Sequence, residues 1–136
     1  MIHFFSDFDK MGLNISGKDE DKMKNPIERK NLFDDIPEKA REEIFTDLLV
    51  TDSFRLERIV SQGQSSPDGF WYDQDDAEWV VLLRGAAGMR FEGLPEIVEL
   101  RPGDYVHIRP HVRHRVDWTA KDEDTVWLAI RYCSKA

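Results

Sequence analysis

From residue 44 onward the sequence is a series of short β-rich runs, and this pattern is the feature that most restricts the fold. Within the runs apolar residues tend to alternate with polar ones, and clusters of Gly, Pro, Asp or Ser separate them. The predicted strands span residues 44–50, 54–60, 78–84, 86–91, 97–100, 105–108, 113–118 and 125–132. Because many short strands at intervals of about 8–12 residues are typical of sandwiches and barrels, we predict an all-β domain.

The first part of the chain lacks this pattern. Residues 1–32 are polar and rich in charge after the first few positions, so we predict an extension over 1–32 and one domain over 33–136. A short helix is expected at about residues 36–44. Pro37 and Glu38 are typical of a first helical turn, and Ile36, Ala40 and Ile44 recur at the spacing of one helix face.

The composition excludes several classes of function. With 27 acidic and 19 basic residues the net charge is −8, so the chain has no positive field that would attract nucleic acid or an anionic membrane. No apolar run approaches the ~18–20 residues of a membrane span, and the first residues do not resemble a secretory signal. We therefore expect a cytoplasmic protein. Cys133 is the only cysteine, which excludes an internal disulfide, and we expect it to be a buried, inert thiol.

Two stretches carry the residue types of a binding site. Glu78 stands at the head of an apolar strand, where a carboxylate must face water, pair with an arginine or bind a metal. In the other stretch, three of the four histidines fall within eight residues: His107, His111 and His114. Alternation along the strand places His114 and Trp118 on the same face and directs His107 outward. A carboxylate and an imidazole facing each other are ligands for a first-row metal.

Residues from about 57 to 132 resemble a small single-domain cupin of the cupin 2 type. The first motif of that family ends in E-x6-G, which Glu78 and Gly85 match. The second motif begins with a glycine and contains a histidine, and Gly103 and His114 match these two at the right distance. The resemblance implies a double-stranded β-helix, or jelly-roll barrel, with Glu78 and His114 in its interior.

The chain departs from the metal-binding cupins at the start of the first motif. In cupins with a metal, two histidines of an H-x-H sequence, the glutamate and the second-motif histidine are the usual ligands. The H-x-H is absent here, as in a subgroup of cupins that this chain resembles. Its two places fall on Tyr72 and Gln74 with the shorter spacing of the motif, or on Trp71 and Asp73 with the longer.

Two interpretations of the site stay open. In the first, Gln74, Glu78 and His114 hold one divalent ion (Fe, Mn, Ni or Zn), with Asp73 or Tyr72 as a further ligand. In the second, Glu78 and His114 form a hydrogen-bonded pair in an apolar pocket. The expected pocket also includes Trp71, Asp73, His111 and Trp118.

The predicted function is the binding of a small polar or anionic molecule in the barrel. The alternative is a metal-dependent isomerase, dioxygenase or lyase, with Tyr72 as its candidate acid or base. Arginines around the histidines either form a basic rim that attracts an anion or pair with acids on the surface. They are Arg101, Arg109, Arg113 and Arg115. Because the edge strands of such a barrel need covering, we also expect a homodimer.

Overall fold

The computed structural model describes residues 26–133 and divides the chain into two units, residues 1–34 and 35–136, which we describe separately. In the first unit the described residues form a turn, in which the backbone N–H of Asp34 donates to the carbonyl of Asn31 at 3.1 Å. The predicted extension, 1–32, lies largely outside the described residues, and its boundary stays a prediction.

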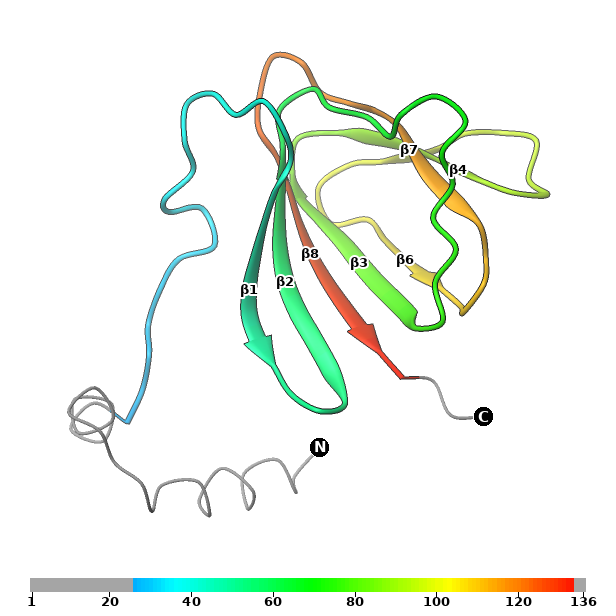
Figure 1. Cartoon of the computed structure of the whole chain (residues 1–136). Helices are drawn as coiled ribbons and strands as arrows, with labels where there is room; N and C mark the ends of the chain where they lie inside the picture. The colour runs from blue at the N-terminus through cyan, green and yellow to red at the C-terminus, as the bar shows by residue number, and fades with distance from the viewer. Residues whose placement is uncertain (1–25, 134–136) are drawn as a thin grey trace. The chain divides into compact units, whose positions relative to one another are not determined.

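The second unit contains eight β-strands in two antiparallel sheets (Figure 1). The five-stranded sheet has the order β1-β2-β8-β3-β6, and the three-stranded sheet has the order β5-β4-β7. All eight predicted strands are present, with ends within one residue of those expected, and the all-β class is confirmed. The strands are β1 (Ile44–Val50), β2 (Phe54–Ser61), β3 (Ala77–Arg84), β4 (Ala87–Phe91), β5 (Val98–Leu100), β6 (Tyr105–Ile108), β7 (His114–Thr119) and β8 (Thr125–Tyr132).

The hydrophobic core lies between the inner faces of the two sheets. Val80 and Leu82 of β3 are buried with Trp127 and Ala129 of β8, as alternation along each strand requires. Met89 of β4 belongs to the same cluster and comes from the smaller sheet. Burying one large aliphatic side chain contributes about 1.5–3 kcal/mol, so this cluster is a main source of stability.

Gly85 allows the chain to leave β3 and enter β4. Its φ is +88°, and a Cβ placed there would lie 2.4 Å from Oγ1 of Thr125. Only glycine combines this backbone conformation with so close an approach, which is the physical reason for the glycine in E-x6-G.

The helix predicted over residues 36–44 was wrong: residues 36–43 form no regular element, and Ile44 already belongs to β1. Side chains from the loop after β2 bind the backbone of this segment instead. The amide of Gln62 accepts from Ala40 N–H at 2.7 Å and donates to the carbonyl of Pro37 at 2.8 Å, and Gln64 donates to the carbonyl of Ala40 at 3.0 Å. These bonds satisfy backbone groups that a helix would have paired internally, so the apolar spacing alone did not decide the structure.

Cys133 also differs from the expectation, because its thiol is exposed. The residue follows the last residue of β8 and lies beyond the packed core. Within residues 26–133, no helix has the length and apolar character needed to cross a bilayer.

Candidate functional site

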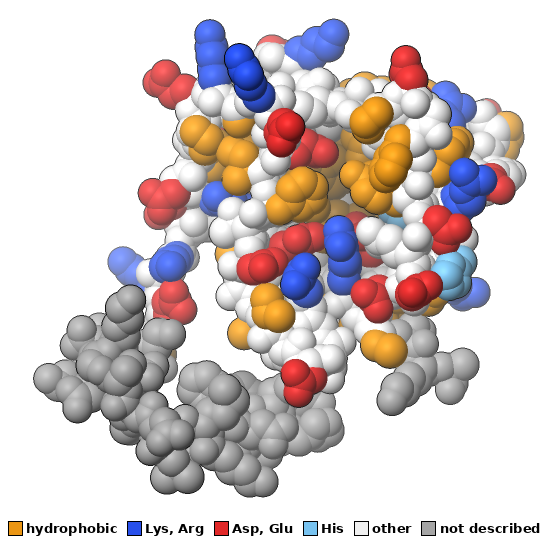
Figure 2. All heavy atoms as spheres, in the orientation of Figure 1, with side chains coloured by type: hydrophobic (Ala, Val, Ile, Leu, Met, Phe, Trp, Pro, Cys, Tyr) orange, Lys and Arg blue, Asp and Glu red, His pale blue; other side chains and the backbone are white. Residues whose placement is uncertain are grey.

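A cavity of about 80 Å³ opens on the inner side of the five-stranded sheet. One water needs roughly 10–15 Å³ of such space, so the cavity has room for several waters or a small organic molecule. Figure 2 shows a hollow on this face of the molecule, bordered by hydrophobic side chains, with acidic and basic side chains below it. The lining consists of Glu43, Phe45, Ile59, Tyr72, Gln74, Glu78, Val80, Met89, His114, Val116, Trp127 and Arg131.

Glu78 faces the cavity from β3 and pairs with an arginine. Its strand neighbour across the ladder is Arg131 of β8, whose Nε lies 3.5 Å from Oε2 of Glu78. The same guanidinium reaches Glu57 of β2, with Nη2 at 3.4 Å from Oε1. The Arg131 Nε and Glu57 Oε1 atoms are buried and make no direct hydrogen bond to described residues, so the two contacts are ion pairs without hydrogen-bond geometry. Burial raises the pKa of Glu78, while the charges of Arg131 and then His114 oppose the rise.

His114 is held beside Tyr72 by the backbone. The two residues exchange hydrogen bonds, from Tyr72 N–H to the His114 carbonyl at 2.7 Å and from His114 N–H to the Tyr72 carbonyl at 3.1 Å. Their rings stack with centroids 5.6 Å apart. Nδ1 of His114 lies 2.8 Å from the carbonyl of Val112. Because a carbonyl can only accept, Nδ1 of His114 carries a proton and donates it to the Val112 carbonyl.

Gln74 brings a polar group without a partner to the same cavity. Its backbone carbonyl accepts from His111 N–H at 2.8 Å, which ties the loop before β3 to the turn before β7. Its side-chain Oε1 is buried and has no hydrogen-bond partner among the described residues. A buried acceptor without a partner costs about 1–3 kcal/mol, so a ligand that donates to Oε1 would recover this energy.

Tyr72 completes the polar part of the lining. Burial is the main reason that the pKa of its phenol is raised, and the charge of Glu43 adds to the effect. The phenol therefore keeps its proton near neutral pH and can donate a hydrogen bond into the cavity.

The structure thus brings four of the residues singled out from the sequence to one cavity: Tyr72, Gln74, Glu78 and His114. The four others expected in the pocket do not line it. Nδ1 of His111 binds Asp73 at 2.8 Å on the surface, and Trp71 lies under the guanidinium of Arg113. The ring of Trp118 packs against the backbone of Gly88. Asp73 and Trp71 lie in the irregular segment before β3, where contacts with His111 and Arg113 rather than strand alternation direct their side chains.

Sequence reasoning missed two charged residues of the cavity. Arg131 shares a strand face with Trp127 and Ala129, so alternation along β8 would have identified it as an inward residue. Glu43 precedes β1 in an irregular segment, where no periodicity indicates a direction. Its carboxylate accepts a hydrogen bond from the hydroxyl of Ser61, and burial raises its pKa.

Three of the four arginines near the histidines pair with acids: Arg101 with Glu99, Arg113 with Glu92 and Arg115 with Asp117. None of the four lines the cavity, so they supply no basic rim to it.

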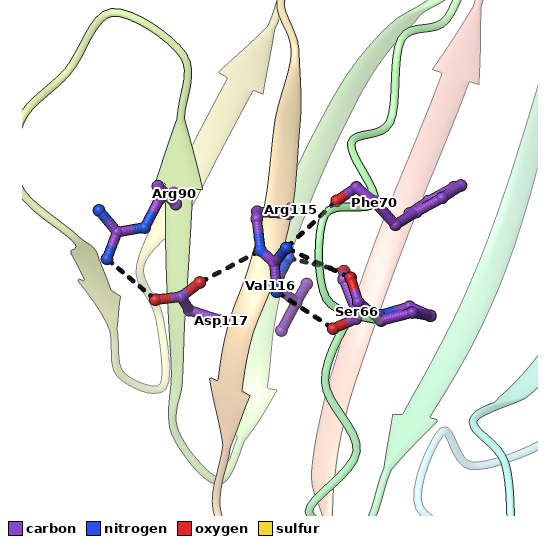
Figure 3. Close-up of polar contacts among 7 residues, drawn as sticks. Ser66, Phe70, Arg90, Arg115, Val116 and Asp117 are labelled. Carbon is purple, nitrogen blue, oxygen red and sulfur yellow. Dashed lines mark hydrogen bonds and ion pairs between the residues drawn. The ribbon is translucent and has the colours of Figure 1, made fainter.

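Arg115 has a structural role that the sequence did not indicate. Figure 3 shows its guanidinium between Asp117 of β7 and the loop that leads to Tyr72. It donates to the carbonyls of Ser66 and Pro67, each at 3.2 Å, and lies 3.2 Å from Asp117. Asp117 in turn pairs with Arg90 at 3.1 Å. The network fastens the loop before Tyr72 to β7 and so positions one wall of the cavity.

The residues present do not fit a resident divalent ion. In residues 26–133 no group of three or more His, Cys, Asp or Glu side chains is arranged to hold one. Of the three predicted metal ligands, only His114 and Glu78 bind first-row metals strongly, and the carboxylate of Glu78 already pairs with the guanidinium of Arg131. The unpartnered oxygen of Gln74 is better suited to a hydrogen-bond donor than to completing this incomplete set.

Comparison with known proteins identifies the family. No protein-family model and no curated protein sequence matches the chain. Among solved structures, a protein from Ralstonia eutropha JMP134 that is provisionally named a mannose-6-phosphate isomerase is 46% identical, with a TM-score of 0.78. The match covers 79% of this chain and 100% of that one.

More distant structures share the fold. A cupin superfamily protein from Desulfitobacterium hafniense is 17% identical, covers 73% of this chain and 84% of that one, and has a TM-score of 0.60. An RmlC-like cupin with a double-stranded β-helix fold from Methanocaldococcus jannaschii is 13% identical, covers 72% and 86%, and has a TM-score of 0.57. These matches confirm the double-stranded β-helix of the cupin fold, and the chain belongs to the same family as the Ralstonia eutropha protein.

Proposed function

We propose that the barrel cavity binds a small polar molecule directly through protein side chains. The observation that carries this proposal is the buried Oε1 of Gln74, which lacks a partner in a cavity that Glu78 and His114 also line. Apolar walls with a few convergent polar groups are typical of small-molecule sites. Arg131 supplies the positive charge next to Glu78, so binding does not depend on a metal.

Nuclear magnetic resonance with a library of small polar compounds tests this function. Compounds that bind should shift the backbone resonances of Tyr72, Gln74 and His114, because these residues surround the cavity. His114→Ala should weaken binding about tenfold or more, the effect of losing one good hydrogen bond in a desolvated site. The matched control is His107→Ala, since His107 is exposed and contacts Tyr132 rather than the cavity. Shifts that map to other surfaces, or no shifts at all, would refute the proposal.

A second candidate is acid–base catalysis at the same site. It is favoured by the burial of Glu78, which raises the pKa of its carboxyl above the ordinary value and so makes it a better proton acceptor than an exposed carboxylate. The Ralstonia relative is provisionally named a mannose-6-phosphate isomerase, and isomerisation of a sugar by proton transfer is acid–base catalysis of this kind. Glu78 would move the proton, and Tyr72, which stays protonated, would donate a hydrogen bond to the substrate oxygen.

Proton exchange separates this candidate from simple binding. An isomerase would exchange a carbon-bound hydrogen of an aldose with deuterium from the solvent, and Glu78→Gln would abolish the exchange. Mannose and mannose 6-phosphate are the probes, each with and without added divalent metal. Binding without any exchange would leave only the first function.

A further inference from the structure

Glu43 is a carboxylate of the cavity wall that is held by a chain of hydrogen bonds. Nε1–H of Trp127 donates to Oγ of Ser61 at 3.1 Å. The Ser61 hydroxyl therefore turns its own proton to Oε2 of Glu43. Ser61 is fully buried and Trp127 is 3% exposed, so this chain is a fixed part of the core. It presents Glu43 to the cavity as a hydrogen-bond acceptor.

The charges around the cavity are not balanced. Among residues 26–133, Arg131 is the only Lys or Arg whose side chain lines the cavity, and it already pairs with both Glu78 and Glu57. Glu43 makes no ion pair with a Lys or Arg among residues 26–133. The lining thus contains two carboxyl groups, Glu43 and Glu78, and one guanidinium, and Glu43 is the carboxyl without an ion pair. An anion entering the cavity would meet both carboxyl groups, while the guanidinium of the lining is already engaged by Glu57 and Glu78.

A further acceptor lines the same cavity. Oε1 of Gln74 is buried and has no hydrogen-bond partner among the described residues. The lining also contains aromatic side chains, which attract cations through their ring faces. They are Phe45, Tyr72 and Trp127. Carboxylates and aromatic rings together form the usual environment of an ammonium group.

We propose that the ligand of this cavity is a small primary amine whose ammonium group binds against Glu43. Its apolar part lies against the wall formed by Ile59, Met89 and Trp127. The inference rests on the proposed function, since it names the class of small polar molecule that the cavity binds. The same charges disfavour an anionic ligand, and none of the arginines near the histidines lines the cavity to attract one.

Three probes test the inference. n-Butylamine, which is an ammonium ion near neutral pH, and 1-butanol have similar sizes and differ in charge. Inorganic phosphate is the anionic probe. The readout is the indole N–H resonance of Trp127, assigned with a Trp127→Phe variant. The amine should shift this resonance saturably and bind about tenfold or more tightly than the alcohol, the difference expected for one charge-assisted hydrogen bond. Phosphate should produce no saturable shift.

Variants then assign the preference to Glu43. Glu43→Gln keeps an acceptor for Ser61 and removes the charge, so it should reduce the affinity for the amine to roughly that for the alcohol. Glu99→Gln is the matched control, because Glu99 lies on β5 outside the cavity, and it should leave the affinity unchanged. The comparison between amine and alcohol needs no variant, so the inference is testable even if Glu43→Gln does not fold.

The outcomes separate this inference from the proposed function. Equal affinity for amine and alcohol, saturable binding of phosphate, or unchanged affinity in folded Glu43→Gln would overturn the amine while leaving a polar-molecule site in place. If no probe shifts the Trp127 resonance saturably, and the library of polar compounds also fails to bind, both are overturned.

Discussion

Glu78 and Arg131 lie directly opposite each other on the paired strands β3 and β8, with 3.5 Å between the carboxylate Oε2 and the guanidinium Nε. The arginine also reaches Glu57, so one cation on β8 pairs with two buried carboxylates from β2 and β3, the strands on either side of it. This relationship neutralises part of the charge on the cavity wall and leaves Glu78 partly engaged. Burial of Glu78 opposes its charge, and the arginine offsets part of that cost.

Replacing Glu78 by Gln should not destabilise the protein near neutral pH. The pKa of Glu78 is raised above its ordinary value by burial, so the folded state prefers the protonated form more than the unfolded state does. Its contribution to the free energy of unfolding therefore falls as pH rises through the raised pKa, and above that point the ionised group costs stability. The melting temperature of Glu78→Gln should equal or exceed that of the wild type by a few degrees at about pH 7.5, with a smaller difference at about pH 5. A variant less stable at both pH values would contradict this.

Replacing Arg131 by Met should be strongly destabilising, because it leaves Glu57 and Glu78 buried without a cation. Breaking a buried pair costs about 3–5 kcal/mol, and partial exposure of Arg131 reduces the expected loss to roughly 2–4 kcal/mol. Urea unfolding measures this loss, which should shrink at acidic pH as the carboxyls take up protons. Arg101→Met is the control, since its pair with Glu99 is exposed and should contribute less than about 1 kcal/mol.

Removing the guanidinium of Arg115 should loosen the loop before Tyr72. Arg115→Ala deletes its contacts with the carbonyls of Ser66 and Pro67 and with Asp117, at a cost of about 0.5–1.5 kcal/mol for the part-buried hydrogen bond to Ser66. Amide hydrogen exchange should become faster in residues 66–72, and ligand affinity should fall. Exchange that is unchanged in this loop would show that other contacts hold it.

The turn that contains His111 should respond to pH. Its ring lies between two carboxylates, with Nδ1 2.8 Å from Asp73 and Nε2 3.2 Å from Asp75, which is an arrangement for a doubly protonated ring. The hydrogen bond with Asp73 raises the pKa of His111. The stabilisation is therefore complete below the ordinary value of 6.5 and disappears as pH rises through the raised value.

Amide exchange at His111, whose N–H binds the Gln74 carbonyl, should accelerate over this range beyond the general effect of hydroxide. In Asp73→Asn the transition should move to lower pH. Asp104→Asn, the same substitution at an acid that does not contact His111, is the control. If Asp73→Asn leaves the transition unchanged, the transition does not come from the pair of His111 and Asp73.

The homodimer expected from the sequence remains a prediction. β1 forms one edge of the five-stranded sheet, and three consecutive apolar residues in it are exposed in the described part of the chain: Leu48, Leu49 and Val50. A strand edge of this kind suits pairing with a second copy. Light scattering at micromolar concentration should give twice the mass of the chain, and Leu49→Lys should give the monomer mass. A wild-type monomer would remove the prediction.

The strands and the meeting of Glu78 with His114 in one cavity followed from the sequence alone. Strand formation depends on a local alternation and on turn residues such as Gly85, and both can be read along the chain. The closing of two sheets around one interior then directs the carboxylate and the imidazole to the same side. Residues adjacent in sequence to the cavity residues, such as Asp73, were placed in the pocket wrongly because the backbone direction of an irregular loop has no periodicity to reveal it.

Only the tertiary structure decided which charged side chains line the cavity. Arg131 meets Glu78 because β8 pairs with β3 in one particular register, and a shift by one residue would turn the arginine to the opposite face. Glu43 reaches the cavity because amides of the loop after β2 bind the irregular segment that precedes β1. Both contacts join parts of the chain that are distant in sequence. Such contacts depend on how the sheets close and on which side-chain hydrogen bonds form, and local pattern contains no information about either.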